Sequence, residues 1–361
     1  MKRNYIKSIL TLFTLAIILC GAAGAANAQA QYRKALDFDG DGKVDVTVTR
    51  GQGSSGNSLP WYTRSSQTGA LKTTQWGGGN NNIDFKCAGD FDGDGKADYC
   101  ITRRNESGMV WYIMQSGGTF RTVSFGLQTD RPIPADYDGD GKADIAVWRG
   151  GSGPTGVQWY ILQSSNNQLV VRSSGQDTAS NGAQCFPIPA VDIDGDGKQD
   201  IAQICQATGN VMLWSIRRSS NGATERYYYG INDADNADYP VPADYDGDGK
   251  TDVAVVRVTD TSGGNSSYTW YIRRSSDGGT TAQQFGGSNA NANYYDVVVP
   301  ADYDGDGKAD IAIYRNRSGI TPGIPQYLYA LQSGSGNSLL VVQWGMLGDR
   351  VLMIPTDYLS F

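Results

Sequence analysis

The chain of 361 residues contains no histidine, and this absence excludes several kinds of chemistry. Without an imidazole there is no Ser-His-Asp or Cys-His nucleophile system, and the usual zinc sites lose a principal ligand. Charged residues are also scarce, at 19% of the chain. The arginine pairs at 103–104, 217–218 and 273–274 are isolated and form no basic stripe, so we expect no nucleic-acid partner.

Long apolar runs are missing everywhere except near the N-terminus. Residues 1–30 have a basic start, an apolar run from Ile9 to Leu19, and Ala-x-Ala motifs that end at Ala28 and Ala30. This pattern predicts an export signal, with a membrane anchor or a lipoprotein signal at Cys20 as alternatives. We therefore expect an exported protein (secreted, at the cell surface or in the periplasm) that has no membrane span after signal removal.

Cysteine is rare as well, and four of the five cysteines would remain after signal cleavage. An even number in an oxidising compartment favours disulfides. Each pair brackets one of the acidic loops described below, so a strand–loop–strand hairpin would place its two members opposite each other. We predict the disulfides Cys87–Cys100 and Cys185–Cys205, with free buried thiols as the alternative.

What the chain does contain is one acidic loop, repeated six times. The copy at residues 136–144 reads Asp-Tyr-Asp-Gly-Asp-Gly-Lys-Ala-Asp, with aspartates at positions 1, 3, 5 and 9. Alternate carboxylates in a tight loop can converge on one hard cation, calcium above all, and the carbonyl at position 7 can add a ligand. An EF-hand would need a glutamate at position 12, which is Val147 here.

The predicted cofactor is calcium, with up to six structural ions. A calcium ion exchanged as a signal or shared with a ligand is the alternative role. The six loops hold 24 of the 37 acidic residues, so the formal charge of −7 reflects metal ligation and says little about basic partners. The predicted ligands, with each lysine contributing its backbone carbonyl, are Asp37, Asp39, Asp41, Lys43, Asp45, Asp90, Asp92, Asp94, Lys96, Asp98, Asp136, Asp138, Asp140, Lys142, Asp144, Asp192, Asp194, Asp196, Lys198, Asp200, Asp244, Asp246, Asp248, Lys250, Asp252, Asp302, Asp304, Asp306, Lys308 and Asp310.

Each loop belongs to a larger repeat of 46 to 58 residues. A short extended run precedes the loop, an alternating apolar run follows it, a third run carries Trp-Tyr, and a fourth ends in an aromatic residue and glycine. The third repeat departs from this pattern with Ser174-Gly175. Four antiparallel strands per repeat predict an all-β fold, a β-propeller of four-stranded blades, because closing a ring of blades removes most exposed sheet edges.

Six complete blades can be counted, and seven is the alternative. We expect residues 31–361 to form a single propeller domain, with repeats starting near 31, 84, 130, 186, 238 and 296. The run 351–358 is expected to close the ring against the first blade, in competition with an N-terminal strand at 32–36.

The loops of the form Asp-x-Asp-Gly-Asp-Gly-Lys-x-Asp, with Phe-Gly at the end of several repeats, resemble FG-GAP or VCBS repeats, the calcium-bearing blades of integrin-α-like propellers. The resemblance spans residues 31–361. It implies metal loops on one face of the disc and ligand contacts on the opposite face. The Gly-Ala-Pro element of that family is replaced by runs such as Val147-Trp148-Arg149.

Two recurring features allow both a structural and a functional interpretation. The Trp-Tyr pairs of the third run would pack between blades, or they would stack on sugars. Asp84, Asp130, Asp238 and Asp296 each lie six residues before a loop aspartate, where a turn or cap role is favoured over catalysis. The variable connections between the second and third strands, with the links between repeats, are expected to carry ligand contacts.

We predict a non-enzymatic binding or adhesion-type module, with a carbohydrate-binding lectin as the first alternative and a glycan hydrolase or lyase as the second. Its partner would be a protein or a glycan on the face opposite the calcium loops, and the protein would be a monomer. Glycosidase chemistry requires an acid–base pair of carboxyls. Only 13 of the 37 acidic residues lie outside the loops, and Asp233, Asp235 and Glu225 among them form no convincing pair.

Overall fold

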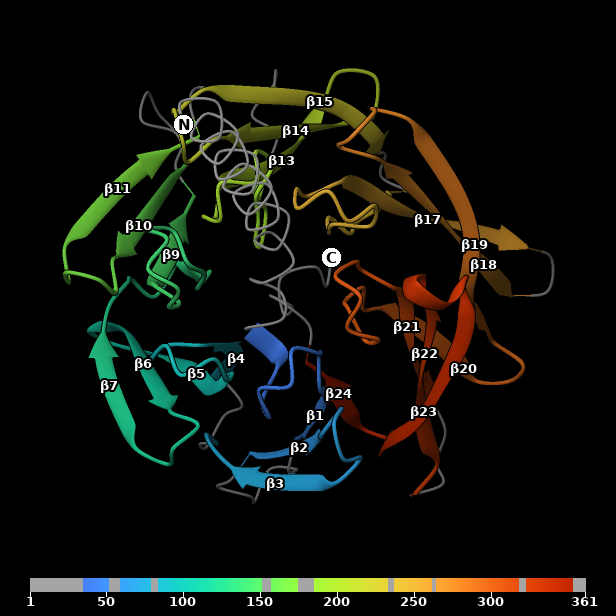
Figure 1. Cartoon of the computed structure of the whole chain (residues 1–361), viewed down its shortest axis with the longest axis horizontal. Helices are drawn as coiled ribbons and strands as arrows, with labels where there is room; N and C mark the ends of the chain where they lie inside the picture. Colours follow the sequence, from blue (N-terminus) through green and yellow to red (C-terminus); the bar gives the residue numbers. More distant parts are fainter. Residues whose placement is uncertain are drawn as a thin grey trace, which may run out of the picture.

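The computed structural model describes residues 35–51, 59–78, 84–150, 157–174, 185–232, 237–261, 264–317 and 323–352. Almost all regular structure in these residues is antiparallel strand, which confirms the predicted all-β class. The strands form repeated units of four, arranged around a common axis (Figure 1). The predicted signal at 1–30, the residues Asp233 and Asp235, and most of the closing run, 353–358, lie outside the described residues.

Four of the units are separate four-stranded sheets. The first sheet has the order β24 (Asp349–Val351), β1 (Val46–Arg50), β2 (Pro60–Arg64), β3 (Leu71–Gln75). The second contains β4 (Asp84–Gly89), β5 (Asp98–Asn105), β6 (Gly108–Met114) and β7 (Phe120–Ser124). The third contains β8 (Arg131–Pro132), β9 (Ile145–Arg149), β10 (Gln158–Leu162) and β11 (Leu169–Ser173). The fourth contains β12 (Cys185–Ile188), β13 (Ile201–Ala207), β14 (Val211–Arg217) and β15 (Thr224–Ile231).

The fifth and sixth units are the two halves of an eight-stranded sheet. The fifth unit contains β16 (Tyr239–Pro240), β17 (Val253–Thr261), β18 (Asn265–Arg273) and β19 (Thr280–Asn289). The sixth contains β20 (Tyr294–Val298), β21 (Ile311–Arg317), β22 (Pro325–Gln332) and β23 (Ser338–Met346), with a short 3-10 helix, η1 (Ser333–Ser335), between the last two. Only two residue pairs, Ser288–Tyr295 and Asn289–Tyr294, join the halves, so each half keeps the form of a separate unit.

The ends of the described chain meet in the first unit. Strand β24, from the C-terminal part, pairs with β1, with Val351 opposite Val48 and Asp349 opposite Arg50. Figure 1 shows this red strand beside the blue one. The strand next to β1 is thus residues 349–351, which begin two residues before the expected closing run. Residues 35–36, at the end of the competing N-terminal run, are helical.

The core lies between neighbouring units. Trp61 and Phe38 of the first unit pack with Tyr99 and Ile101 of the second. The last of these interfaces brings residues of the sixth unit, such as Tyr314, against Val46 and Val48 of the first. Because apolar strand faces must be buried on both sides, each unit needs two neighbours, and this requirement favours a ring.

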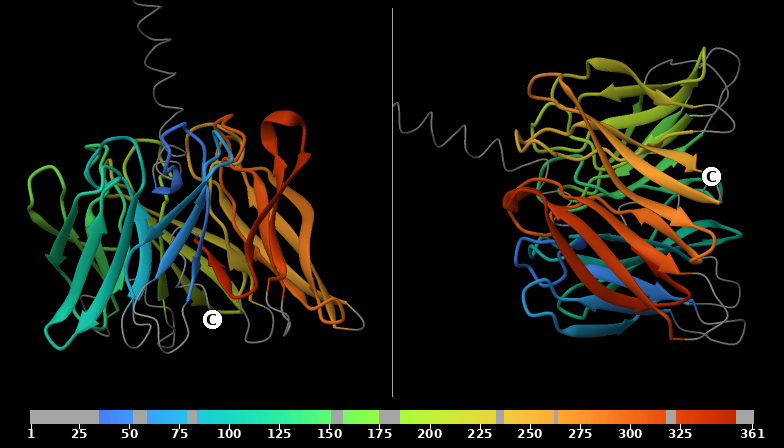
Figure 2. Two further views of the ribbon diagram at one scale, coloured as in Figure 1. Left: turned by 90° about the horizontal axis from the view of Figure 1, so that it is seen from below. Right: turned by 90° about the vertical axis from the view of Figure 1, so that its right-hand side faces the viewer.

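The acidic loops of all units lie on one side of the molecule, where the first strand of each unit leads into the second. The hairpins between the second and third strands extend to the other side, as the antiparallel pairing requires (Figure 2). Parts of these hairpins, 52–58, 151–156 and 318–322, lie outside the described residues. The strands therefore separate a loop end, which carries the acidic loops, from a hairpin end, which carries these hairpins.

Candidate metal centres and the ring that holds them

Each acidic loop is organised around its first aspartate. In the third unit, the carboxylate of Asp136 accepts hydrogen bonds from the backbone N–H groups of Gly139 and Gly141, at 2.6 and 2.9 Å. Both glycines have positive φ, 82° and 89°, so a side chain at either position would be strained. The same pair of bonds, at 2.5 to 3.0 Å, recurs in the other five loops.

The aspartate at position 9 ties the loop to the end of the third strand. Asp144 is fully buried and accepts the N–H of Tyr137 at 2.9 Å and the N–H of Ser164 at 2.6 Å. The other five loops repeat this arrangement through Asp45, Asp98, Asp200, Asp252 and Asp310. A backbone N–H just after the third strand therefore anchors each loop, a contact that sequence reasoning missed.

Serine hydroxyls also contact the central aspartates of the loop. Ser164 Oγ donates to Asp140 at 2.9 Å, and Ser165 Oγ donates to Asp138 at 2.6 Å. Equivalent serines contact the loops of the first, fourth and fifth units. These bonds orient the carboxylates at positions 3 and 5 but bring no positive charge to them.

In four loops the carboxylates at positions 1, 3 and 5, three of the four predicted carboxylate ligands, come together. One oxygen from each lies within 4.8 Å of the others in Asp37–Asp39–Asp41, Asp90–Asp92–Asp94, Asp192–Asp194–Asp196 and Asp244–Asp246–Asp248. In the third loop the group is Asp136, Asp138 and Asp144, so position 9 takes the place of position 5. Asp302 apart, no loop aspartate forms an ion pair with a lysine or arginine of the described part of the chain.

The electrostatics of the loops fit a divalent cation. Burial, together with repulsion from neighbouring aspartates, raises the pKa of several loop carboxyls, although backbone N–H groups oppose the shift. The pKa rises to about 7 for Asp98, Asp200 and Asp244. It rises to about 6 for Asp45, Asp144, Asp192, Asp252 and Asp310. In addition, Asp194 Oδ1 is buried without a hydrogen-bond partner. Converging carboxylate oxygens that lack a counter-charge are the donor set that hard cations take.

The six loops are joined to one another in a closed cycle. The N–H at position 8 of each loop donates to the carbonyl at position 1 of the preceding loop, at 2.7 to 3.1 Å. The six bonds are Ala97 to Asp37, Ala143 to Asp90, Gln199 to Asp136, Thr251 to Asp192, Ala309 to Asp244 and Val44 to Asp302. The last bond returns from the first loop to the sixth, so the cycle has no free end.

A second contact follows the same cycle. The lysine at position 7 of each loop lies across the glycine at position 4 of the preceding loop, as Lys198 does over Gly139. A Cβ on Gly139 would stand 2.8 Å from Lys198 Cε, and Lys43 closes the series over Gly305. Position 4 thus requires glycine both for its positive φ and for this close approach.

A different set of aspartates occupies the hairpin end. Asp130 forms a bidentate ion pair with Arg149, at 2.7 Å for both bonds, and accepts the N–H of Leu127 from the link with the preceding unit. The guanidinium carbon of Arg149 lies 4.1 Å from the ring centroid of Tyr160. The same ion pair and the same stacking recur as Asp84–Arg103–Tyr112, Asp238–Arg257–Tyr271, Asp296–Arg315–Tyr329 and Asp349–Arg50–Tyr62.

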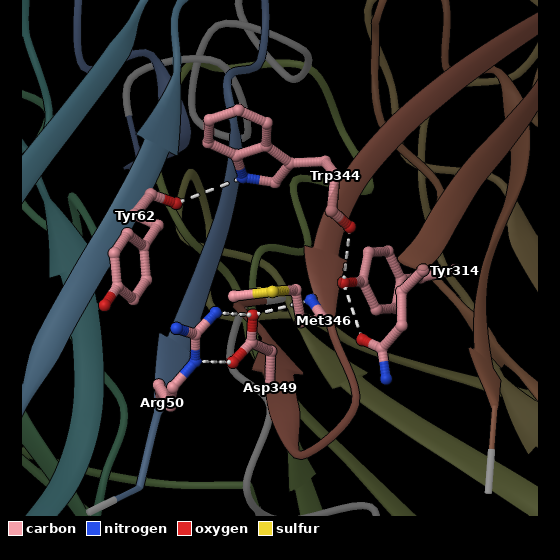
Figure 3. A network of polar contacts seen from close by, with 7 residues as sticks. Arg50, Tyr62, Tyr314, Trp344, Met346 and Asp349 are labelled. Carbon is pink, nitrogen blue, oxygen red and sulfur yellow. Dashed lines mark hydrogen bonds and ion pairs between the residues drawn. The ribbon is translucent and has the colours of Figure 1, made fainter. Parts of the chain in front are cut away.

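The last of these sets joins the two ends of the described chain (Figure 3). Arg50 of β1 holds Asp349 of β24, and Asp349 accepts the N–H of Met346 at 2.8 Å. Trp344 Nε1 donates across the seam to the carbonyl of Tyr62 at 3.2 Å. Trp76 makes the same bond to Tyr112 between the first and second units, so the seam copies a contact inside the chain.

The structural interpretation of Asp84, Asp130, Asp238 and Asp296 is thereby supported, since both oxygens of each are held by an arginine. Sequence reasoning missed those arginines. A signal was available, because Arg50, Arg103, Arg149, Arg257 and Arg315 all lie 13 residues after the first aspartate of a loop.

The fourth unit has no such set. Cys205 occupies the arginine position, and it pairs directly with Cys185 on the neighbouring strand. Ser215 replaces the tyrosine. The predicted disulfides Cys87–Cys100 and Cys185–Cys205 are both formed, but at different levels, since Cys100 lies three strand positions nearer its loop than Cys205.

Among the described residues, the tryptophans of the third strands and Glu225 are buried or already paired. Trp61, Trp111, Trp159, Trp214 and Trp270 are at most 1% exposed, so they pack between units and cannot stack on sugars. Glu225 forms an ion pair with Arg218 and accepts a hydrogen bond from the hydroxyl of Tyr227. Within the described residues, no helix is both long and apolar enough to cross a membrane.

A family model described as an FG-GAP-like repeat matches residues 37–101, 90–147, 136–203 and 244–313, together more than half of the chain. No curated protein gives a match. Among solved structures, TolB from Acinetobacter baumannii is 15% identical, with a TM-score of 0.47, over 85% of this chain and 66% of TolB.

AofleA from Arthrobotrys oligospora is 10% identical, with a TM-score of 0.47, over 89% of this chain and 90% of its own. A putative 6-phosphogluconolactonase from Bacteroides fragilis is 13% identical, with a TM-score of 0.37, over 86% of this chain and 96% of its own.

Proposed function

Since this chain belongs to the FG-GAP-like repeat family, we propose that it is an exported β-propeller of six blades, stabilised by calcium, that acts as a non-enzymatic binding module. Each four-stranded unit is one blade, and β24 closes the ring with β1. The closed cycle of six loop-to-loop hydrogen bonds supports six blades over seven, because a seventh blade would have to interrupt it. The propeller domain would span residues 31–361.

The loop residues would hold calcium in each blade. The carboxylates at positions 1, 3, 5 and 9 and the carbonyl at position 7 would supply the oxygen ligands, as in calcium loops generally. A bound ion would neutralise the clustered aspartates and would rigidify a loop that also supports its neighbour. The metal is therefore structural in this proposal.

One observation supports the proposal that the protein catalyses no reaction. The recurring carboxylates of the molecule are committed either to the loops or to arginines, and Glu225 is paired with Arg218. A glycosidase would need two carboxyls with free access to a substrate. Export is supported by the two disulfides, which persist in oxidising compartments.

The proposed partner is a protein or a glycan bound at the hairpin end, where variable connections are presented by a rigid ring. The test is a glycan array probed with the mature protein in calcium and again after chelation. Saturable, calcium-dependent binding to one sugar class would identify a lectin. If the array were silent while the protein remained folded, a protein partner would be indicated.

Release of reducing ends from any array polysaccharide during the incubation would contradict the non-enzymatic proposal. The matched control for that assay is Glu225→Gln, since Glu225 is the described carboxylate outside the loops that sequence analysis considered for catalysis. Loss of hydrolysis in this variant would locate the activity in this propeller.

A further inference from the structure

A cleft lies at the loop end, between the second and third units. Its volume is about 370 Å³, within the usual range of ligand sites. Its wall includes Val123 of β7, Ile145 of β9 and Leu162 of β10, which form an apolar surface. Strand β7 and the pair β9–β10 are neighbours in Figure 1.

Polar groups surround this apolar wall. Arg121 of β7 and Lys142 of the third loop contribute two cations, and Gln115 and Gln163 contribute amides. The Oε1 atom of Gln115 accepts a hydrogen bond from Thr119, and that of Gln163 accepts one from Asn166, so each amide is oriented with its oxygen toward its own turn. Asp92 is the carboxylate that faces the cleft, and it can accept a hydroxyl.

The surroundings of Arg121 on β7 differ from those of the corresponding residue at the interface between the first and second units. Lys72 of β3 occupies the position of Arg121 in the first unit, and its ammonium lies 5.4 Å from the ring centroid of Tyr99. Arg121 faces Ile145 instead of a tyrosine, because Ile145 stands where the second unit has Tyr99. Among the described residues, Arg121 forms no ion pair and stacks on no ring.

We propose that this cleft binds an oligosaccharide that carries carboxylates, of the uronic acid type. Arg121 and Lys142 would hold the carboxylate, the amides and Asp92 would hold hydroxyls, and the apolar wall would cover the C–H face of a sugar ring. The proposal rests on the binding role given above and names one ligand class. It adds a site at the loop end, away from the hairpin end.

Calorimetric titration with a trimer of galacturonic acid, in calcium, tests this site. We expect saturable binding that weakens as salt is raised, and binding of the neutral galactose trimer at least about tenfold weaker, since a charged hydrogen bond is lost. The variant Arg121→Gln should lower the affinity for the acidic trimer about tenfold or more. The control Lys72→Gln, at the matched position of the first unit, should leave it unchanged.

The proposal is overturned if the acidic trimer does not bind saturably, if the neutral trimer binds equally well, or if Arg121→Gln binds like the parent protein. An unchanged melting temperature of Arg121→Gln would assign a loss of binding to the site and not to the fold. Failure of the acidic trimer to bind, while another glycan or a protein binds equally to the parent protein and to Arg121→Gln, would refute this cleft and leave the general binding function intact.

Discussion

The aspartates at the loop end and those at the hairpin end differ in what stands beside them. At the hairpin end, five aspartates, four of them buried and Asp84 half-buried, each face an arginine that forms two hydrogen bonds to the carboxylate. At the loop end, 24 aspartates share six loops, and in the first five loops the described lysines and arginines form no ion pair with them. A buried carboxylate needs a partner charge or it loses its ionisation. The comparison therefore supports the proposal that the metal is held at the loop end, while arginines serve as the counter-charge at the hairpin end.

The fourth unit differs from the other five units at the hairpin end. It has a covalent link, Cys185–Cys205, at the strand level where the other five units have an ion pair. The second unit has both, since Cys87–Cys100 lies nearer the loop and Asp84–Arg103 remains. The first two strands of a unit are thus held together at this level by either chemistry.

The largest effect is expected from pH, and with opposite signs in the presence and absence of calcium. In the calcium-free protein, burial raises the pKa of Asp98, Asp200 and Asp244 to about 7, well above the ordinary value of 3.8. The folded state therefore binds protons that the unfolded chain does not. Its free energy of unfolding should increase as pH falls from about 7 towards 4, by on the order of several kcal/mol over all loops.

With calcium bound the trend should reverse, because protons displace the metal from the same carboxylates. Chemical denaturation at a series of pH values, with and without chelator, measures both curves. If the free energy of unfolding had the same pH dependence with and without chelator, the proposal that the loops bind the metal would be refuted.

Removal of one arginine at the hairpin end should cost about 3 kcal/mol, at the lower limit for broken buried pairs because Arg149 is partly exposed. In Arg149→Ala, Asp130 would remain fully buried with only the N–H of Leu127 as a partner. Urea denaturation measures the loss. The double variant Asp130→Asn/Arg149→Gln should recover part of it, and equal losses in both variants would argue against an electrostatic cause.

Replacement of Cys185 and Cys205 by serine should lower the free energy of unfolding by about 2–3 kcal/mol, as expected for a cross-link over 20 residues. The ion pair can be introduced in its place as Cys185→Asp/Cys205→Arg/Ser215→Tyr. This triple variant should be more stable than the double serine variant. If it is less stable, the two chemistries are not interchangeable at this level.

The smallest effect is expected from the stacked tyrosines. Tyr160→Leu keeps the apolar contact but removes the aromatic face under Arg149, and it should cost about 0.5–1 kcal/mol. Tyr112→Leu in the second unit is the matched comparison. A loss as large as that of Arg149→Ala would mean that the tyrosine positions the ion pair and does more than stack on it.

Much of this organisation could be predicted from the sequence because it recurs at fixed spacing. The loop aspartates, the alternation that follows them and the paired cysteines are all local patterns. The arginines of the hairpin-end pairs were missed because four of them have a partner 19 residues earlier, on the other side of a loop, and only strand pairing brings the two together. The partner of Arg50, Asp349, lies 299 residues later in the chain. The bonds between successive loops were also unpredictable, because they join backbone groups whose identity no side chain reveals.

The cleft beside Arg121 was missed for a related reason. Arg121 lacks an aromatic neighbour because Ile145 occupies the position that Tyr99 has in the second unit. This difference can be recognised only when it is known which units lie side by side. The closing strand was anticipated near the C-terminus, but its pairing with β1 depends on the position of Asp349 opposite Arg50.

The central claim is that the loop end is completed by calcium. The most direct measurement is the number of calcium ions that the mature protein retains at equilibrium, combined with its melting temperature before and after chelation. We predict about six ions per chain and a large fall in melting temperature on chelation, since each filled site contributes about 2.7 kcal/mol when free calcium is about 100 times its Kd. Retention of no calcium, with the same melting temperature in chelator, would contradict the account.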